Sequence, residues 1–309
     1  MPYLPMTPLP QAEVLAAAER RWKALSELQP DLQSAIDLQR RLLTRVIDLS
    51  RTIDGGRLPR LSLPARYLAA KLSRGVPILA GEPVPLPAGL LTSALLGFCT
   101  ELGAAGAGDA AVHIAEAVGS GRMDGGSLLT ACLNRDQEAI RTGASHMGLA
   151  PDLAWLIAEL AVGPVAHALQ RALFLTTPGP LADALAAWNQ GYCPACGSWP
   201  ALAEVVGGHR LLRCSFCAAT WERTTYSCVY CDEAGEAFVT AAPDQMRTHR
   251  RLELCSGCGA YLKAIEAAEL SPFPLVAVAD METMDLDVAA MDHHFGRPPL
   301  REFKTGARG

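Results

Sequence analysis

The chain has 309 residues, of which 50% are hydrophobic, and its formal net charge at pH 7 is −5. This length is enough for two domains of ordinary size with a sizeable core. No apolar run reaches the roughly 18 residues that span a bilayer. The run from Leu90 to Cys99 is too short, and charged residues such as Asp152 and Glu159 interrupt the later one. We therefore expect a soluble protein.

The first helix with a clear pattern follows Asp31, which is placed to cap it. Its apolar residues recur three or four positions apart, with charged residues such as Arg40 and Asp48 between them, and Gly55-Gly56 ends it. This pattern is typical of a helix with one buried stripe, formed here by Leu38, Leu42, Val46, Leu49 and Ile53.

Similar patterns predict a helical bundle over residues 1–185, where no alternation typical of strands occurs. Gly163-Pro164 is expected to break or kink the longest helix. Cys99 and Cys132 have apolar neighbours, so we expect both in core packing and not in ligation or catalysis. The further helices are expected at about residues 12–28, 65–72, 90–102, 109–118, 127–142, 152–174 and 181–188.

This half of the chain contains no nucleophile motif, phosphate-binding loop or dinucleotide fingerprint. The stretch from Gly103 to Gly108 is rich in Gly and Ala but lacks the Lys-Ser/Thr pair of a nucleotide-binding loop. We therefore assign no catalytic and no organic-cofactor-binding residue.

Four Cys-x-x-Cys pairs follow, and they contain eight of the ten cysteines. Two residues between the thiols allow one tight turn to direct both sulfurs at a single ion, and two such turns complete a tetrahedron. Gly197 and Gly259 follow the second thiol of their pairs, where glycine tolerates a left-handed turn. The predicted metal ligands are Cys193, Cys196, Cys214, Cys217, Cys228, Cys231, Cys255 and Cys258.

The segments between the pairs predict hairpins. Residues 201–206 and 209–213 read as two short strands around Gly207-Gly208, which would bring the first two pairs together. Residues 238–240, 252–254 and 261–265 are expected to form the corresponding strands of a second unit. Hairpins favour sequential pairing of the four turns, while a cross-brace, pairing first with third and second with fourth, stays open at this point.

Three other interpretations compete with a functional metal site at the cysteines. Residues 1–8 lack the basic start and apolar run of a secretory signal, so a reducing compartment is expected, where disulfides are rare. A thioredoxin-like motif occurs once beside a βαβ pattern, not four times without one. A purely structural ion is the stronger competitor, because such a site contributes about 10 kcal/mol or more to a small domain.

The cysteine-rich part is acidic. Residues 191–270 contain seven Lys or Arg and nine acids, and thiolate coordination adds negative charge, while nucleic-acid binding requires a positive face. A nucleic-acid module is therefore disfavoured. The seven basic residues are Arg210, Arg213, Arg223, Arg247, Arg250, Arg251 and Lys263.

The order of these features resembles the formate dehydrogenase accessory protein FdhE family. The resemblance is specific over residues 191–287, from Gly-Tyr-Cys-Pro-Ala-Cys-Gly-Ser-Trp-Pro through the other cysteine pairs to Asp-Met-Glu-Thr-Met-Asp-Leu-Asp. Upstream it depends on length, helix content and Arg-Met-Asp-Gly-Gly-Ser at residues 122–127. The family motif supplies no catalytic residue.

The resemblance implies a cytoplasmic maturation factor and not an enzyme. Such a factor binds iron in two rubredoxin-like tetracysteine sites and binds the catalytic subunit of respiratory formate dehydrogenase before export. Zinc gives the same geometry without redox activity, so the residues alone leave the metal open. The alternative is a rubredoxin-like electron carrier or a redox enzyme that acts on the formate dehydrogenase active site. A zinc-ribbon nucleic-acid-binding module is the second alternative. No membrane insertion is expected.

The fold class expected is α plus small β, with an all-α N-terminal domain before two tandem rubredoxin-like or zinc-ribbon-like tetracysteine modules. The expected limits are 1–185 for the helical domain, 186–226 and 227–270 for the two modules, and 271–309 for a partly helical C-terminal segment.

Overall fold

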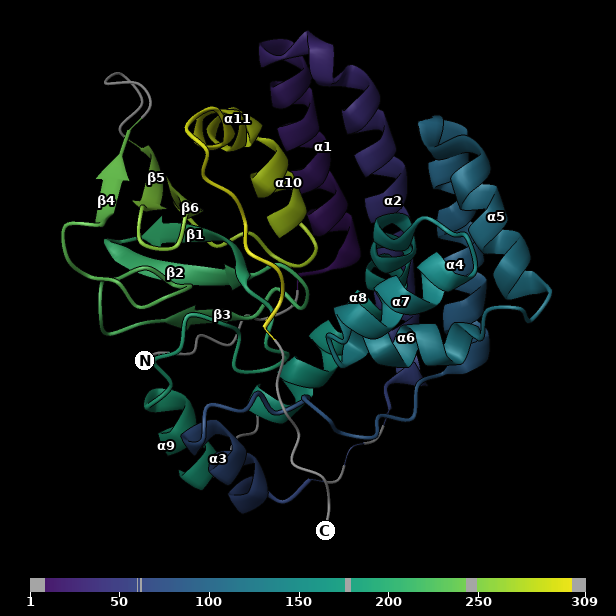
Figure 1. Ribbon diagram of the computed structural model, residues 1–309, viewed down its shortest axis with the longest axis horizontal. Coiled ribbons are helices and arrows are strands. Elements are labelled where there is room, and N and C mark those ends of the chain that lie inside the picture. The colour runs from purple at the N-terminus through teal and green to yellow at the C-terminus, as the bar shows by residue number, and fades with distance from the viewer. Residues whose placement is uncertain (1–8, 60, 62, 176–178, 243–248, 302–309) are drawn as a thin grey trace. The chain divides into compact units, whose positions relative to one another are not determined.

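The computed structural model describes residues 9–59, 61, 63–175, 179–242 and 249–301 (Figure 1). It divides into two compact units, and each combines segments that are distant in the chain. Residues 9–62 and 79–172 form a helical unit, while residues 63–78 and 173–303 form a unit that contains the sheet. The expected class, helices first and then a small sheet with two tetracysteine groups, is confirmed. The expected domain limits stay a prediction.

The helical unit is built on amphipathic helices whose apolar sides are buried. A 3₁₀ turn, Pro30–Leu32, precedes α2, and π-helical turns at Ile53–Arg57 and Gly103–Ala107 follow α2 and α4. The helices are α1 (Gln11–Leu28), α2 (Gln33–Thr52), α4 (Ala88–Leu102), α5 (Gly108–Gly119), α6 (Gly125–Leu133), α7 (Gln137–His146) and α8 (Pro151–Leu175).

Two expectations about α2 are wrong in detail. Asp31 does not cap the helix, because it lies in the 3₁₀ turn and the N-cap position is Leu32, which makes no side-chain capping bond. The buried stripe is also rotated: Leu38 and Leu42 are only half-buried. The positions of α2 that are buried are Ile36, Leu43, Val46, Ile47 and Leu49, followed by Ile53 in the π turn.

The helix expected over residues 127–142 is two helices, α6 and α7. They are separated at Arg135, whose φ is 61°, a value that ends a right-handed helix. By contrast, α8 continues through Pro164, so that Gly163-Pro164 does not break it.

Helix α8 is a largely buried helix of this unit. Two helical stretches, residues 88–119 and 151–174, are long and apolar enough to cross a membrane by length and composition alone. The first is divided at Gly106, where φ is 105°, and α4 packs against α5. The second is lined by fully buried residues, as expected of a core helix: Ala154, Ile157, Ala158, Ala161, Val162, Val165 and Ala166.

The second unit contains one six-stranded sheet in the order β3-β2-β1-β6-β5-β4. Neighbouring strands are antiparallel except β1 and β6, which are parallel. The predicted hairpin strands are all present. The strands are β1 (Pro200–Val206), β2 (His209–Cys214), β3 (Thr220–Glu222), β4 (Phe238–Ala241), β5 (Arg250–Cys255) and β6 (Ala260–Glu266).

The sheet is a tandem repeat of two three-stranded modules. In chain order, β1, β2 and β3 correspond to β4, β5 and β6, because each set begins after one cysteine pair and places a second pair after its middle strand. The parallel β1–β6 pairing, Ala203 with Ala264 through Val205 with Glu266, joins the modules edge to edge. The two predicted modules therefore share one sheet.

Two C-terminal helices, α10 (Val276–Met281) and α11 (Met284–Asp292), cover one face of this sheet (Figure 1). Side chains alternate along β6, so Tyr261, Lys263 and Ile265 point to the same face. Ile265 joins the cluster around Val276 of α10, and Tyr261 joins the cluster around Leu286 of α11. Two further helices of this unit, α3 (Ala65–Ser73) and α9 (Gly179–Ala186), pack on each other.

Candidate metal centres

Strand direction places all four cysteine pairs at one end of the sheet. One pair precedes β1 and one follows β2, and the same holds for β4 and β5. Because β1 and β4 point the same way across the intervening strands, the two repeats present their cysteines at the same end. The sheet therefore places two tetracysteine groups at the same end, one in each three-stranded module.

The first group is closed. It contains Cys193, Cys196, Cys214 and Cys217, and each is at most 2% exposed. The Sγ of Cys196 lies 3.5 Å from that of Cys214 and 3.7 Å from that of Cys217, while Cys193 and Cys217 are 3.6 Å apart. Backbone N–H groups of Phe216 and Cys217 donate to the Cys214 sulfur, each at 3.4 Å.

The second group has the same plan but is open on one side. Cys228 and Cys255 are buried, whereas Cys231 and Cys258 are exposed. The Sγ atoms of Cys228 and Cys258 are 3.7 Å apart, and those of Cys231 and Cys255 are 3.6 Å apart. The structure thus pairs the four turns sequentially, as the hairpins predicted, and not as a cross-brace.

Both groups fit a tetrahedral ion. A tetrahedron with metal–sulfur bonds of about 2.3 Å has sulfur–sulfur edges of about 3.8 Å. The separations given above are 3.5 to 3.7 Å, and within each group all four sulfurs lie within 4.8 Å of one another. A disulfide requires about 2.05 Å, so these sulfurs are not bonded to one another. Metal occupancy itself stays a prediction.

The turn after each second cysteine is left-handed in all four pairs. Gly197 and Gly259 have φ of 84° and 68°, as predicted. The same position is taken by Ala218 at 53° and by Asp232 at 66° in the other two pairs. Asp is one of the residues that tolerate this conformation, so Asp232 carries a weak local signal, whereas Ala218 carries none.

Burial keeps several of these sulfurs protonated when no ion is bound. Burial is the main cause that raises the pKa of Cys193 and Cys217 well above the usual thiol value, and it raises the pKa of Cys228 to about 11. Since the thiolate is the metal ligand, binding an ion releases protons from these groups. The charge of the cation offsets the cost of burying the resulting anions.

Aromatic side chains connect the surroundings of the two groups. Tyr192 precedes Cys193, and Tyr230 lies between Cys228 and Cys231. Trp199 contacts both rings edge-on, with centroids 5.9 Å from Tyr192 and 5.0 Å from Tyr230. Trp188 continues the chain, 5.4 Å from Tyr192. Sequence reasoning missed this chain, although Tyr192 and Trp199 flank the first cysteine pair.

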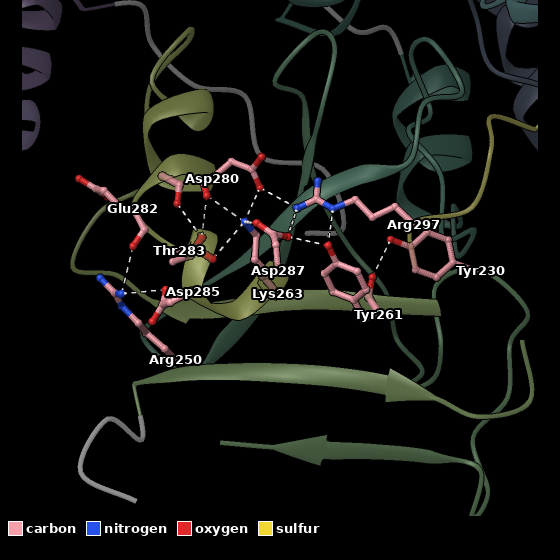
Figure 2. A network of polar contacts seen from close by, with 11 residues as sticks. Tyr230, Arg250, Tyr261, Lys263, Asp280, Glu282, Thr283, Asp285, Asp287 and Arg297 are labelled. Atoms are coloured by element: carbon pink, nitrogen blue, oxygen red, sulfur yellow. Dashed lines mark hydrogen bonds and ion pairs between the residues drawn. The ribbon is translucent and has the colours of Figure 1, made fainter. Parts of the chain in front are cut away.

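A polar clasp holds the C-terminal helices on the second module (Figure 2). The Lys263 ammonium is 0% exposed and lies 2.7 Å from an Asp280 carboxylate oxygen and 2.6 Å from one of Asp287. Arg297 donates to both carboxylates, and the Tyr261 hydroxyl donates to Asp287 at 2.7 Å. We call Tyr261, Lys263, Asp280, Asp287 and Arg297 the C-terminal clasp. Its acids belong to the motif at residues 280–287 noted in the sequence.

The two remaining cysteines belong to the helical unit. Cys99 is 3% exposed and Cys132 is 0% exposed. Burial raises the pKa of the Cys99 thiol to about 11, which is the behaviour of a structural cysteine. Core packing, expected for both residues, is confirmed.

Comparison with known proteins gives consistent results. The chain is 29% identical over 120 residues to a protein named FdhE homolog from Aquifex aeolicus, covering 35% of this chain and 40% of the relative. It is 30% identical over 115 residues to the FdhE homolog of Haemophilus ducreyi, covering 36% and 37%. No family model matches the chain.

The fold likeness extends over the whole chain. The crystal structure of the FdhE protein from Pseudomonas aeruginosa matches with a TM-score of 0.62 and 21% identity, covering 99% of this chain and 100% of that one. The chain is therefore similar to FdhE homologs in sequence over the aligned part, and it shares the fold of an FdhE protein. The sequence alignments with the FdhE homologs span only about two fifths of their length, so the likeness at low identity establishes the fold of the remainder.

Proposed function

We propose that the chain is a metal-binding accessory protein for the maturation of respiratory formate dehydrogenase. In this proposal it acts in the cytoplasm, on the catalytic subunit, before that subunit is exported. The supporting observation is that an FdhE-type chain places two tetrahedral sets of four sulfurs at one end of one sheet. Within it we propose residues 186–226 and 227–270 as the two metal modules.

The proposed ligands are the eight cysteines of the two groups. Iron is proposed on the family resemblance, and zinc would occupy the same tetrahedra, since both accept four thiolates. Bound iron supplies one-electron chemistry, and bound zinc supplies structure alone. Elemental analysis of protein purified without oxygen, with absorption spectra before and after reduction, distinguishes the two.

The role proposed is assistance to a client and not catalysis. Two cysteine modules held in one sheet offer an ordered surface to which a protein partner can bind. The charge of these modules does not favour nucleic-acid binding. In the described part of residues 191–270 each Lys or Arg is in an ion pair, and Arg247 lies outside the described residues. The pairs are Arg210–Glu253, Arg213–Glu204, Arg223–Asp232, Arg250–Asp285, Arg251–Glu266 and Lys263–Asp280.

The aromatic chain favours a second candidate, a rubredoxin-like electron carrier acting on the client. Trp199 and Tyr230 are in edge contact between the surroundings of the two sulfur groups. With iron in both sites, such contact would support electron exchange between them. This candidate requires reversible reduction at a physiological potential, and protein that contains only zinc would exclude it.

A deletion strain tests the leading proposal. We expect loss of respiratory formate oxidation with the catalytic polypeptide still synthesised, and restoration by the intact chain. A chain with Ala at all four cysteines of either group should not restore activity, whereas Cys99→Ala should, because Cys99 lies outside both groups. Normal formate oxidation in the deletion strain would refute the proposal.

Capture of the client tests the partner. An affinity-tagged chain, bound to a column, should retain the formate dehydrogenase catalytic subunit from an extract of cells in which export is blocked. Absence of that subunit from the eluate, with the tagged chain folded and loaded with metal, would argue against direct binding.

A further inference from the structure

The two sulfur groups differ in their access to solvent, although the repeat makes their geometry alike. In the first group every cysteine is at most 2% exposed. In the second group each Cys-x-x-Cys pair has one buried and one exposed member: Cys228 with Cys231, and Cys255 with Cys258. One side of the second tetrahedron therefore faces solvent.

The residues around the first group explain why it is closed. Ser198 is 0% exposed, and its hydroxyl lies 3.3 Å from the Cys196 sulfur. Ala195, between the first two cysteines, is 0% exposed, and Phe216, between the next two, is 5% exposed. An incoming ligand could reach these sulfurs only if the module opened.

The second group has exposed loops where the first has buried side chains. The loops at residues 231–236 and 256–259 are exposed apart from half-buried Glu233. Gly257 lies beside the Cys255 sulfur: a Cβ at residue 257 would be 3.6 Å from that sulfur and 3.9 Å from the Ala237 Cβ and the Glu233 side chain, which is ordinary van der Waals contact. The turns that carry the two buried cysteines are held by backbone hydrogen bonds to the Cys228 carbonyl at 3.0 Å and to the Cys255 carbonyl at 2.8 Å.

We propose that the two sites have different roles: the first is a permanent structural site, and the second is an exchange site that accepts a thiol or chelating ligand from outside. This inference depends on the proposed metal binding. In the exchange, Cys231 or Cys258 leaves the ion as a thiolate and takes up the proton that the incoming thiol gives up. The metal keeps its oxidation state, and Cys228 and Cys255 hold it in place.

The first measurement uses the whole chain loaded with two zinc ions per molecule without oxygen. Treatment with the chromogenic chelator 4-(2-pyridylazo)resorcinol should release one ion at least about tenfold faster than the other. Native mass spectrometry should show a folded intermediate with one ion. Release of both ions at one rate would overturn the proposal.

The second measurement identifies the site. Brief alkylation of the loaded chain with N-ethylmaleimide, followed by peptide mapping, should modify Cys231 and Cys258 first and leave the six buried ligands, with buried Cys99 and Cys132 as unmodified references. Equal labelling of the two groups would overturn the assignment.

Two matched variants distinguish this proposal from its premise. Cys258→Ala should keep one tightly held ion, and Cys217→Ala, at the corresponding position of the first module, should lose the slow phase of release. If the intact chain binds no ion at all, the metal-binding proposal fails. If it binds two that behave alike, only the division of roles fails.

Discussion

Gly191 lies directly against the backbone of Val229. This contact joins the segment that leads into the first cysteine group to the Cys228–Cys231 turn of the second group. A Cβ at residue 191 would overlap the Val229 carbonyl oxygen and lie 2.8 Å from its Cα. Gly191 is two residues before Cys193, and Val229 follows Cys228. A glycine is therefore required here by close approach of two backbones.

Gly191→Ala should lower the free energy of unfolding by about 2 to 4 kcal/mol, since a rigid backbone cannot move aside as a side chain can. Both groups should hold ions less tightly, because the clash displaces a turn in each. Urea unfolding and zinc content measure this. Gly143→Ala in α7 is the control, with open space around the added methyl. If both substitutions are equally mild, the close approach is not a constraint.

Lys263→Met in the C-terminal clasp should destabilise the sheet unit by about 3 kcal/mol. Without the Lys263 ammonium, Arg297 is the one clasp cation left to pair with the carboxylates of Asp280 and Asp287. Arg251→Met provides the control on the same sheet, since Arg251 and Glu266 are 37% and 54% exposed and 3.7 Å apart. Loss of this exposed ion pair should lower the free energy of unfolding by less than about 1 kcal/mol. Chemical denaturation of both variants measures the difference, and similar losses would contradict the clasp.

Sequence predicted the features of the cysteine modules that depend on local spacing. The Cys-x-x-Cys turns, the Gly207-Gly208 hairpin with φ of 58° and 84°, and the strands around it were all found where expected. In each case the signal lies within a few residues, where sterics and turn chemistry decide the outcome. The sequential pairing of the turns follows from those hairpins.

Features set by distant residues were not predictable. The parallel β1–β6 pairing joins strands that are far apart in the chain, such as Ala203 with Ala264, and no local pattern specifies it. The break at Arg135 arises because its buried guanidinium pairs with Glu159 at 2.6 Å and stacks over Trp155. Likewise, nothing near Lys263 in the sequence indicates that a lysine will be buried against two acids.

Asp287 should make stability depend on pH in the acid range. Burial raises its pKa, but hydrogen bonds from Lys263 and Tyr261 and the nearby cations lower it below the usual value overall. The stabilisation is therefore complete above the unfolded-state pKa of about 3.9 and is lost as pH falls through the lower folded-state value.

Asp287→Asn should accordingly lower the free energy of unfolding most at neutral pH, and the difference from the unmodified chain should shrink below about pH 4. Urea midpoints of the two proteins across this range provide the measurement, and taking the difference cancels any loss of ions common to both. A deficit that stays constant down to the acid limit would show that the carboxylate charge is not what stabilises the clasp.

Complete metal removal should unfold the sheet unit and spare the helical unit. Strand β3 has three residues and β4 has four, so ions bound at the proposed sites would be needed to keep these edge strands ordered. Loss of a structural ion costs about 10 kcal/mol. Helix α8 has its own core of fully buried residues. Hydrogen exchange with mass spectrometry, after chelation in mild urea, should show loss of amide protection in β1, β2, β5 and β6 while α8 stays protected. Equal loss of protection in α8 would mean that the two units unfold as one, and that the ions stabilise the whole chain.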